Sequence, residues 1–441
     1  MLMTVACLGF FALSVQSLEF TYHHFPEMER VLKDFNTKYP AITNLYSIGK
    51  SVKGRDLWVF VVGLYPTEHK IGIPDFKYIA NMHGNEVVGR ELMLHLIEYL
   101  LINYQSDPVI KQMVNKARIH IMPSMNPDGF EIAEVLDCSS LQGRYNDAGI
   151  DLNRNFPDPF ADSPFAIQPE TKAIIDWVKE ETFVLSANFH GGALVASYPY
   201  DNSANGKTLL NYSNHTVPPD IDVLKYLAET YSNNHATMSK PNDCASIDFT
   251  GGITNGFSWY PVEGGMQDYN YVFGQCLEIT LELSCCKYPN DSLLEQHWRD
   301  NKVAMIEYMK KVHMGIKGQV FDTDGKPVMN AIVDVQGRKR ICPYRTNKYG
   351  EYYYLLLPGT YTFNVSVQNA TILTKITIPE SVDFSAMTYN FQFKVMTGDT
   401  IPLTTSCSAT ERSSSSSSST LKTCLLTILL KTVLILFVNA L

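Results

Sequence analysis

The feature of the sequence that most limits its fold is an alternation of short apolar runs and longer helical stretches between Leu18 and about His313. Short apolar runs are typical of buried strands, whereas longer stretches with helical periodicity favour helices. The expected strands are Leu57–Val62, Phe76–Asn81, Arg118–Met122, Phe183–Asn188 and Cys276–Leu283. The expected helices are Glu86–Tyr104, Pro169–Glu181, Ile221–Met238 and Leu293–Val312. This order predicts an α/β fold with a mixed, largely parallel sheet and helices on both faces.

Four titratable side chains lie near the carboxyl ends of these strands. His83 follows the second expected strand, and Glu86 opens the helix after it. His190 follows the fourth strand, and Glu282 lies near the end of the fifth. Open α/β sheets bind ligands beyond the carboxyl ends of their strands. We therefore expect the four side chains to meet at one edge of the sheet.

The residue types indicate a catalytic zinc site. Two imidazoles and one carboxylate, from His83, Glu86 and His190, leave a fourth position open for water, which distinguishes catalytic from structural zinc. Zinc lowers the pKa of bound water and polarises a carbonyl, and a carboxylate outside the ligand set can take the proton. Glu278 and Glu282 share one strand face, so spacing alone does not choose between them as this base. Glu282 lies nearer the end of the strand.

An anion site and the overall charge point to the kind of substrate. Asn153 and Arg154 follow Asp151 in GRYNDAGIDLNRNFPD, and an arginine fork binds a carboxylate through two hydrogen bonds. Nothing physical singles out Arg154 from the 36 basic residues. A net charge of -9 argues against nucleic acid as a partner and fits a basic substrate.

The two ends of the chain resemble targeting signals. Residues 1–17 have an apolar core, and Val15 and Ser17 suit a secretory cleavage site. The core is too short to span a membrane. At the other end, a serine run and an apolar tail interrupted by Lys431 follow the pattern of a GPI anchor signal within 396–441. The alternative is a disordered tail with a terminal membrane helix. We expect a GPI-anchored protein on the extracellular face of the plasma membrane.

Cysteines and glycosylation sequences agree with secretion. Seven of the nine cysteines lie outside the segments expected to be removed, so an odd thiol remains. Cys276, within an apolar strand, is the candidate for a buried free thiol. Adjacent Cys285 and Cys286 point to opposite strand faces, so each is expected to pair elsewhere. Asn-x-Ser/Thr sequences occur at Asn211, Asn214, Asn290, Asn364 and Asn369.

The character of the chain changes after His313. Turn signals recur at Asp324-Gly325, Tyr349-Gly350 and Pro358-Gly359. From Tyr361 to Val367 apolar and polar residues alternate, which indicates a half-buried strand with Asn364 on its wet face. We expect a small all-β sandwich over residues 314–395.

Several segments together resemble the zinc metallocarboxypeptidases of the regulatory (N/E) subfamily. These segments are IANMHGNEVVGRELMLHL, IHIMPSMNPDGFE, DLNRNFPD, ANFHGGALVASYPYD, TNGFSWYPVEGGMQDYNY and CLEITLELSC. The resemblance covers nearly all of the chain from Leu18 to Val395. It implies a carboxypeptidase-like catalytic domain over 18–313 and a transthyretin-like sandwich over 314–395.

The resemblance also implies roles that spacing does not show. It assigns one Zn²⁺ to His83, Glu86 and His190, and the general base to Glu282. It makes Arg144 the group that polarises the scissile carbonyl. The residues implied to bind the end of the substrate are Asn153, Arg154 and Tyr260 for its carboxylate, and Asp201 and Gln267 for a basic side chain. The implied disulfides are Cys138–Cys286, Cys244–Cys285 and Cys342–Cys407.

The leading hypothesis is therefore an exopeptidase that removes C-terminal Arg or Lys from peptides and proteins. We also weigh a non-catalytic peptide-binding or adaptor protein on this fold. Some relatives bind without cleaving, and these typically lack a zinc ligand or the base, whereas this chain keeps them all. A zinc deacylase of N-acyl amino acids is a third hypothesis, against which Asp201 and the β-sandwich argue. A monomer with further cell-surface protein partners is expected.

Overall fold

The computed structural model describes residues 17–162, 165–204, 216–241, 244, 249–380, 384–394 and 407. The expected signal up to residue 16, the serine run, the apolar tail and the sequences at Asn211 and Asn214 lie outside these residues. Within the described part of the chain, no helix combines the length and the apolar character needed to cross a bilayer.

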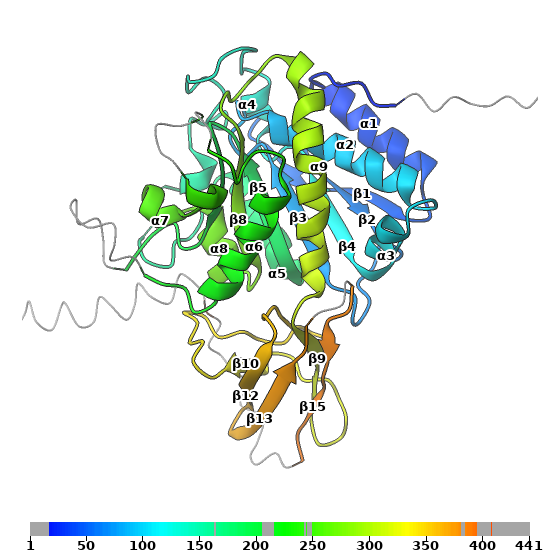
Figure 1. Cartoon of the computed structure of the whole chain (residues 1–441), viewed down its shortest axis with the longest axis vertical. Helices are drawn as coiled ribbons and strands as arrows, with labels where there is room; N and C mark the ends of the chain where they lie inside the picture. The colour runs from blue at the N-terminus through cyan, green and yellow to red at the C-terminus, as the bar shows by residue number, and fades with distance from the viewer. Residues whose placement is uncertain are drawn as a thin grey trace, which may run out of the picture.

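One mixed sheet of eight strands forms the body of the molecule (Figure 1). Its strands are β1 (Thr43–Lys50), β2 (Asp56–Val62), β3 (Asp75–Ala80), β4 (Arg118–Met122), β5 (Phe183–His190), β6 (Ala193–Tyr198), β7 (Ile253–Asn255) and β8 (Leu277–Ser284). They lie in the order β1-β2-β4-β3-β5-β8-β6-β7. The central strands β4, β3, β5 and β8 run parallel to one another. Their carboxyl ends therefore open at one edge of the sheet.

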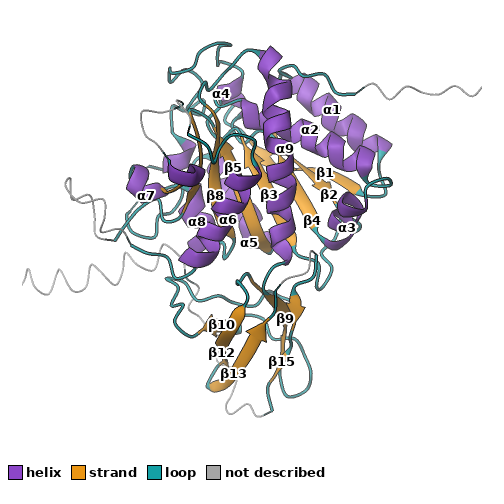
Figure 2. Ribbon diagram, in the orientation of Figure 1, coloured by secondary structure: helices purple, strands orange, loops and turns teal. Residues whose placement is uncertain are grey.

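Helices cover both faces of this sheet (Figure 2). They are α1 (Phe25–Lys38), α2 (Val88–Asn103), α3 (Pro108–Lys116), α4 (Pro127–Phe130), α5 (Pro169–Glu180), α6 (Ile221–Asn234), α7 (Gly256–Trp259), α8 (Met266–Val272) and α9 (Leu294–Lys310). Alternate residues of β2 show the two faces: Phe60 and Val62 belong to the core layer that includes residues of α2, α6 and α9, whereas Val59 and Val61 belong to the layer that includes residues of α5. The period of two in a strand thus divides the core into two layers.

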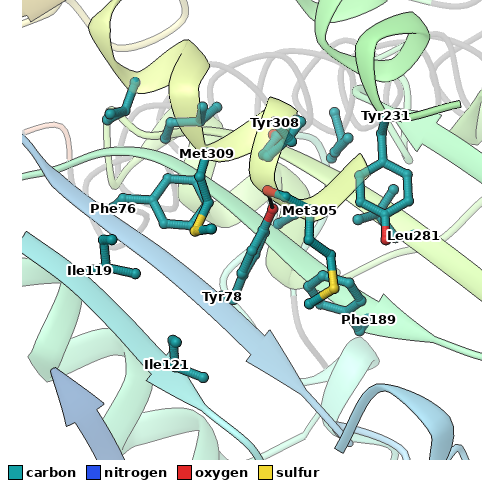
Figure 3. Packing of buried hydrophobic residues seen from close by; sticks show 14 of the residues in the cluster. Phe76, Tyr78, Ile119, Ile121, Phe189, Tyr231, Leu281, Met305, Tyr308 and Met309 are labelled. Carbon is teal, nitrogen blue, oxygen red and sulfur yellow. Dashed lines mark hydrogen bonds between the residues drawn. The ribbon is translucent and has the colours of Figure 1, made fainter. Parts of the chain in front are cut away.

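The layer beneath α9 is rich in aromatic and methionine side chains (Figure 3). Phe76 and Tyr78 of β3 point toward Met305 and Tyr308 of α9. The hydroxyl of Tyr78 donates a 2.9 Å hydrogen bond to the carbonyl of Met305. This bond satisfies a polar group that would otherwise be buried without a partner.

Two smaller sheets follow the large one. Their strands are β9 (Ile316–Phe321), β10 (Ile332–Val335), β11 (Glu351–Tyr354), β12 (Gly359–Val367), β13 (Ala370–Ile378), β14 (Met387–Thr388) and β15 (Phe391–Gln392). Residues of both sheets, including Val320, Val333 and Phe363, share one core, as in a β-sandwich. Asn364 and Asn369 are exposed, as the alternation predicts for Asn364. The predicted fold class is confirmed, whereas the domain boundaries stay predictions.

Ion pairs connect the sandwich to the large sheet and its helices. The imidazole of His69 bridges Asp75 of β3 and Glu351 of β11, at 3.2 and 2.5 Å. Arg338 and Arg340 of the sandwich pair with Asp220, just before α6. The two parts are therefore joined at the edge of the large sheet opposite the carboxyl ends of its parallel strands.

Two expected helix boundaries are wrong. Glu86 does not open α2, because a turn fixed by the amide of Asn81 delays the helix to Val88. The helix expected over Ile221–Met238 ends at Asn234, because His235 is extended and its Nδ1 accepts from the backbone of Met238. In addition, β5 extends two residues beyond the expected strand, so that His190 belongs to the sheet itself.

Candidate metal centre and pocket

The loop after β3 is shaped by one asparagine. Asn81 adopts a left-handed φ of 59°, which ends the strand and which asparagine tolerates better than most residues. Its Nδ2 donates to the carbonyls of His83, Gly84 and Glu86 at 3.1, 2.9 and 3.3 Å. A side chain at Gly84 would lie 2.3 Å from the backbone of Gly129, so only glycine fits. The turn brings the His83 and Glu86 side chains to one point.

His190, at the end of β5, completes a compact group of three. The Oε2 of Glu86 lies 2.9 Å from Nδ1 of His83 and 2.8 Å from Nδ1 of His190. The two Nδ1 atoms are 3.1 Å apart. All three atoms carry lone pairs, and a cation between them would satisfy all three at once. Imidazole nitrogen and carboxylate oxygen are zinc ligands, so these residues fit the metal that the sequence predicts.

Asp151 fixes the orientation of one of these imidazoles. Its Oδ1 accepts from Nε2 of His83 at 3.0 Å, which leaves Nδ1 of that ring free for a metal. Burial alone would raise the pKa of Asp151, but the attraction of His83 and Arg144 holds it well below its usual value. The carboxylate therefore stays ionised and keeps its hold on the ring.

Arg144 lies between this carboxylate and the three-residue group. Its Nε and Nη2 donate to Oδ2 of Asp151 at 3.1 and 2.9 Å. Its Nη1 donates to Oε1 of Glu86 at 3.2 Å. The guanidinium is thus held beside the metal centre, where it can donate to an oxygen of a bound ligand.

Glu282 lies across from His190 on the neighbouring strand β8. The two residues are register partners in the parallel β5–β8 ladder. Glu282 is buried, and its Oε2 has no hydrogen-bond partner in the described part of the chain. Burial and the nearby charge of Glu86 raise the pKa of Glu282 to about 7. A carboxyl group with a free oxygen and a pKa near neutrality can accept a proton and return it.

Glu278, the alternative base, is fully occupied elsewhere. Its carboxylate accepts from Asn188 at 2.8 Å and Asn270 at 2.6 Å, and pairs with Lys77 at 3.4 Å. It is completely buried and does not line the pocket. These contacts make Glu278 part of a polar core network, and the geometry favours Glu282 as the base.

The structure brings most of the predicted site residues into one pocket of about 180 Å³. The predicted residues that line it are His83, Glu86, Arg144, Asn153, His190, Asp201, Tyr260 and Glu282. Arg154 and Gln267 are not among the lining residues, but each contacts one of them. Gln267 donates from Nε2 to Oδ1 of Asp201 at 2.7 Å, and Arg154 donates from Nη1 to the carbonyl of Asn153 at 2.9 Å.

Asp201 forms the acidic part of the pocket. It is 6% exposed, and burial raises the pKa of its carboxyl group to about 7 against the opposing attraction of Arg154. A Cβ at Gly256 would lie 1.8 Å from Oδ1 of Asp201, so the space beside the carboxylate depends on this glycine. Tyr260, by contrast, is 41% exposed.

Among the residues that the structure places at the site without a role from the sequence reasoning, four carry a carboxylate, hydroxyl or ammonium group. They are Asp151 behind His83, and Ser197, Thr280 and Lys287 in the pocket lining. Asp151 could have been found, because it directly precedes the Asn153-Arg154 pair. The other three carry no local signal, since ordinary strand and loop sequences surround them.

Comparisons with known proteins agree with this geometry. Residues 28–304 match the zinc carboxypeptidase family. The chain is 57% identical over 388 residues to carboxypeptidase M of Mus musculus, covering 87% of each chain. It is 47% identical over 366 residues to carboxypeptidase D of Mus musculus, covering 82% of this chain but 26% of that relative. The structure of carboxypeptidase A from Helicoverpa armigera shares the fold, with a TM-score of 0.52 and 20% identity over 66% of this chain and 75% of that one.

The resemblance predicted from the sequence is thereby confirmed. The short layout and the terminal signal also predict a likeness to carboxypeptidase M, which the 57% identity bears out. The disulfides Cys138–Cys286, Cys244–Cys285 and Cys342–Cys407 form as expected, and Cys276 is free and buried. With its His-Glu-His group and its family match together, this chain belongs to the zinc carboxypeptidases, a family of hydrolytic enzymes.

Proposed function

We propose that this enzyme removes C-terminal Arg or Lys from peptides and proteins at the extracellular face of the plasma membrane. The observation that carries the specificity is the Asp201 carboxylate, buried in the pocket. Among the described residues, no Lys, Arg or His lies within ion-pair distance of it. A C-terminal basic side chain would supply the missing cation.

The pocket favours such a side chain for an energetic reason. Charge-assisted hydrogen bonds from a guanidinium or ammonium group would offset the burial of the Asp201 carboxylate. An apolar C-terminal residue would leave this carboxylate buried and unpaired, which is the basis of strong discrimination. Gln267 holds one carboxylate oxygen and so fixes the direction in which the other faces.

The remaining residues divide the work of hydrolysis. His83, Glu86 and His190 would hold a zinc ion, which would supply an acidified water and polarise the scissile carbonyl. Glu282 takes the proton of the attacking water and passes it to the leaving amine. Arg144 donates hydrogen bonds to the oxygen of the scissile carbonyl as negative charge develops on it.

The end of the substrate is held by a second group. Asn153 and Arg154 bind the free carboxylate of the C-terminal residue, so that the bond before this residue lies at the centre. Tyr260 closes over the substrate terminus. The exposure of its side chain supports this movement.

Paired peptides test the proposal directly. Purified enzyme is incubated with three peptides that differ only in a terminal Arg, Lys or Leu, and released amino acids are measured by mass spectrometry. We expect release of Arg and Lys at least about 100-fold faster than release of Leu, since rejecting a partner that leaves a buried polar group unpaired reaches this scale. Equal rates, or rates unchanged by a zinc chelator, would overturn the proposal.

Membrane attachment has its own support and test. The targeting signals at both ends, the three disulfides and the exposed Asn290, Asn364 and Asn369 support an oxidising, extracellular location. Intact cells that express the chain are treated with phosphatidylinositol-specific phospholipase C. We expect peptidase activity to move into the medium, and activity that stays on the cells would contradict the anchor.

A further inference from the structure

The N-terminal strap, residues 18–23, lies along α2 in the opposite direction (Figure 1, blue). At one end of the strap, the backbone N–H of Leu18 donates to Oε1 of Glu98 at 2.7 Å. In the middle, the ring of Phe20 stacks on His95 with the ring centroids 4.0 Å apart. At the other end, the backbone N–H of His23 donates to Oε1 of Glu91 at 3.0 Å. Since the three helix residues are spaced at three and four positions, they share one face of α2. The strap is thus fixed to the helix at both of its ends.

Glu98 is a buried carboxylate that lacks a cation. It is 9% exposed, and the N–H of Leu18 is its single hydrogen-bond donor among the described residues. No Lys, Arg or His of the described chain pairs with it. The neighbouring His95 supplies no charge, because burial lowers its pKa to about 4 and the ring is neutral at pH 7. A carboxylate in such a place is costly unless a positive group joins it.

We propose that removal of the secretory signal at the Ser17–Leu18 bond creates this positive group, and that the new α-ammonium of Leu18 forms an ion pair with Glu98. Water supplies the hydroxyl that ends Ser17 as a carboxylic acid and the hydrogen that makes the Leu18 nitrogen an amine, which then takes up a proton. The nitrogen already lies 2.7 Å from the carboxylate, so no rearrangement is needed. This inference rests on the secretory part of the proposed function and adds a structural role for the processing site.

The position of the cut matters for this pair. Cleavage one residue earlier would leave a neutral amide N–H at Glu98, and cleavage one residue later would remove the nitrogen altogether. Val15 and Ser17 favour the same bond for an unrelated reason, because their small side chains suit the processing protease. A groove of about 310 Å³, lined by Ser17, Glu98, Asn103 and Trp298, leaves room beside the nitrogen for the larger ammonium group.

The full chain, secreted from cultured cells, gives the first test. Mass spectrometry of the N-terminal peptide is expected to show that the secreted protein begins at Leu18. Reductive methylation at pH 7 with limiting reagent then compares the α-amine in the native protein and in Glu98→Gln. We expect the amine of the native protein to react about tenfold more slowly, which corresponds to a pKa higher by one unit. A different first residue, or equal reaction rates, would overturn the pairing.

A double-mutant cycle gives the second test. One variant carries an alanine inserted between Ser17 and Leu18, so that cleavage after Ser17 moves the ammonium away from Glu98; the other is Glu98→Gln. Each is expected to lower the Tm by about 2 °C, and their combination by no more than either alone. The matched control is Glu295→Gln, which changes another acid on the same groove that is paired with Arg299 at 2.7 Å. Additive losses of Tm in the two variants would refute the ion pair.

Peptide hydrolysis separates the two proposals. The alanine insertion and Glu98→Gln are both expected to retain the rate of peptide hydrolysis and the preference for terminal Arg. Retention of residues 1–17 in the secreted protein would contradict the signal as well as the pair, whereas loss of hydrolysis in the native protein would contradict the proposed activity alone.

Discussion

Asp201→Asn isolates the charge on which the proposed specificity depends. The amide keeps the size of the carboxylate, so the pocket stays filled while a bound guanidinium loses its counter-charge. Removing one partner of a buried, hydrogen-bonded charge pair costs about 2–5 kcal/mol. Since about 1.4 kcal/mol is a factor of ten, kcat/KM for a peptide ending in Arg should fall by about 30- to 4000-fold.

The assay compares two peptides that differ only in a terminal Arg or Leu. For the peptide ending in Leu, kcat/KM should change by less than about threefold, because no charge pair is lost. The zinc content should stay at one ion per chain, since Asp201 is not among the three grouped metal-binding residues. Asp147→Asn, which makes the same chemical change in a partly exposed pair with Lys53, is the matched control. An equal fall for both peptides would refute the reasoning.

The pH dependence of the native enzyme gives an independent view of the same charge. Burial raises the pKa of Asp201 to about 7, so the free enzyme holds a neutral carboxyl group below this pH and a carboxylate above it. The ratio of kcat/KM for Arg over Leu peptides should therefore rise about tenfold between pH 6 and pH 8. The titration of Glu282 cancels in this ratio, because the residue acts in the hydrolysis of both peptides. In Asp201→Asn the ratio should be flat, and a persistent rise would assign the titration to another group.

Three further predictions follow from the contacts described above. Glu282→Gln should lower kcat by at least about 100-fold with zinc content unchanged by atomic absorption, and a variant that keeps its activity would exclude this residue as the base. Asp151→Asn should weaken zinc binding by about 10- to 100-fold in a chelator competition, because the amide lacks the charge that holds His83 and Arg144 in place, and unchanged affinity would contradict that role. Tyr78→Phe should lower the free energy of unfolding by about 1 kcal/mol in urea titration, since the hydrogen bond to the carbonyl of Met305 is lost. An unchanged free energy of unfolding would show that this hydrogen bond makes no net contribution to stability.

The central strands could be predicted from the sequence because they are buried on both faces. β4, for example, is completely buried and coincides with the expected strand Arg118–Met122, in which Ile119 and Ile121 alternate with polar residues. By contrast, β1 at the edge of the sheet is mostly half-buried, so TNLYSIGK carries no clear apolar pattern. In α1, by contrast, Phe25, Met28, Leu32 and Phe35 recur at helical spacing and pack against the core, so periodicity could have revealed this helix. Tertiary position thus explains why β1 was missed, but not α1.

Some residues of the site could likewise be predicted from the sequence, and others could not. His83, Glu86, His190 and Glu282 could be predicted together because each lies at the end of a strand, where sheet geometry makes side chains converge. The choice of Glu282 over Glu278 required the family resemblance, because the partners of Glu278 come from strands and helices that no local pattern connects. Arg144 and Asp201 lie on loops, and neither spacing nor composition distinguishes one loop residue from another.

The ladder between β5 and β8 has a consequence for how new specificities could arise. His190 and Glu282 face each other across two paired central strands, whereas Asp201 and Tyr260 belong to segments outside these strands. Strand pairing therefore fixes His190 and Glu282, which we propose as a metal ligand and the base, whereas Asp201 and Tyr260, which we propose to recognise the substrate, lie outside this ladder. Libraries restricted to these outer segments should yield enzymes with altered terminal preference but the same catalytic geometry. The paired strands would thus keep the catalytic geometry constant, while the segments outside them would set the terminal residue that is recognised.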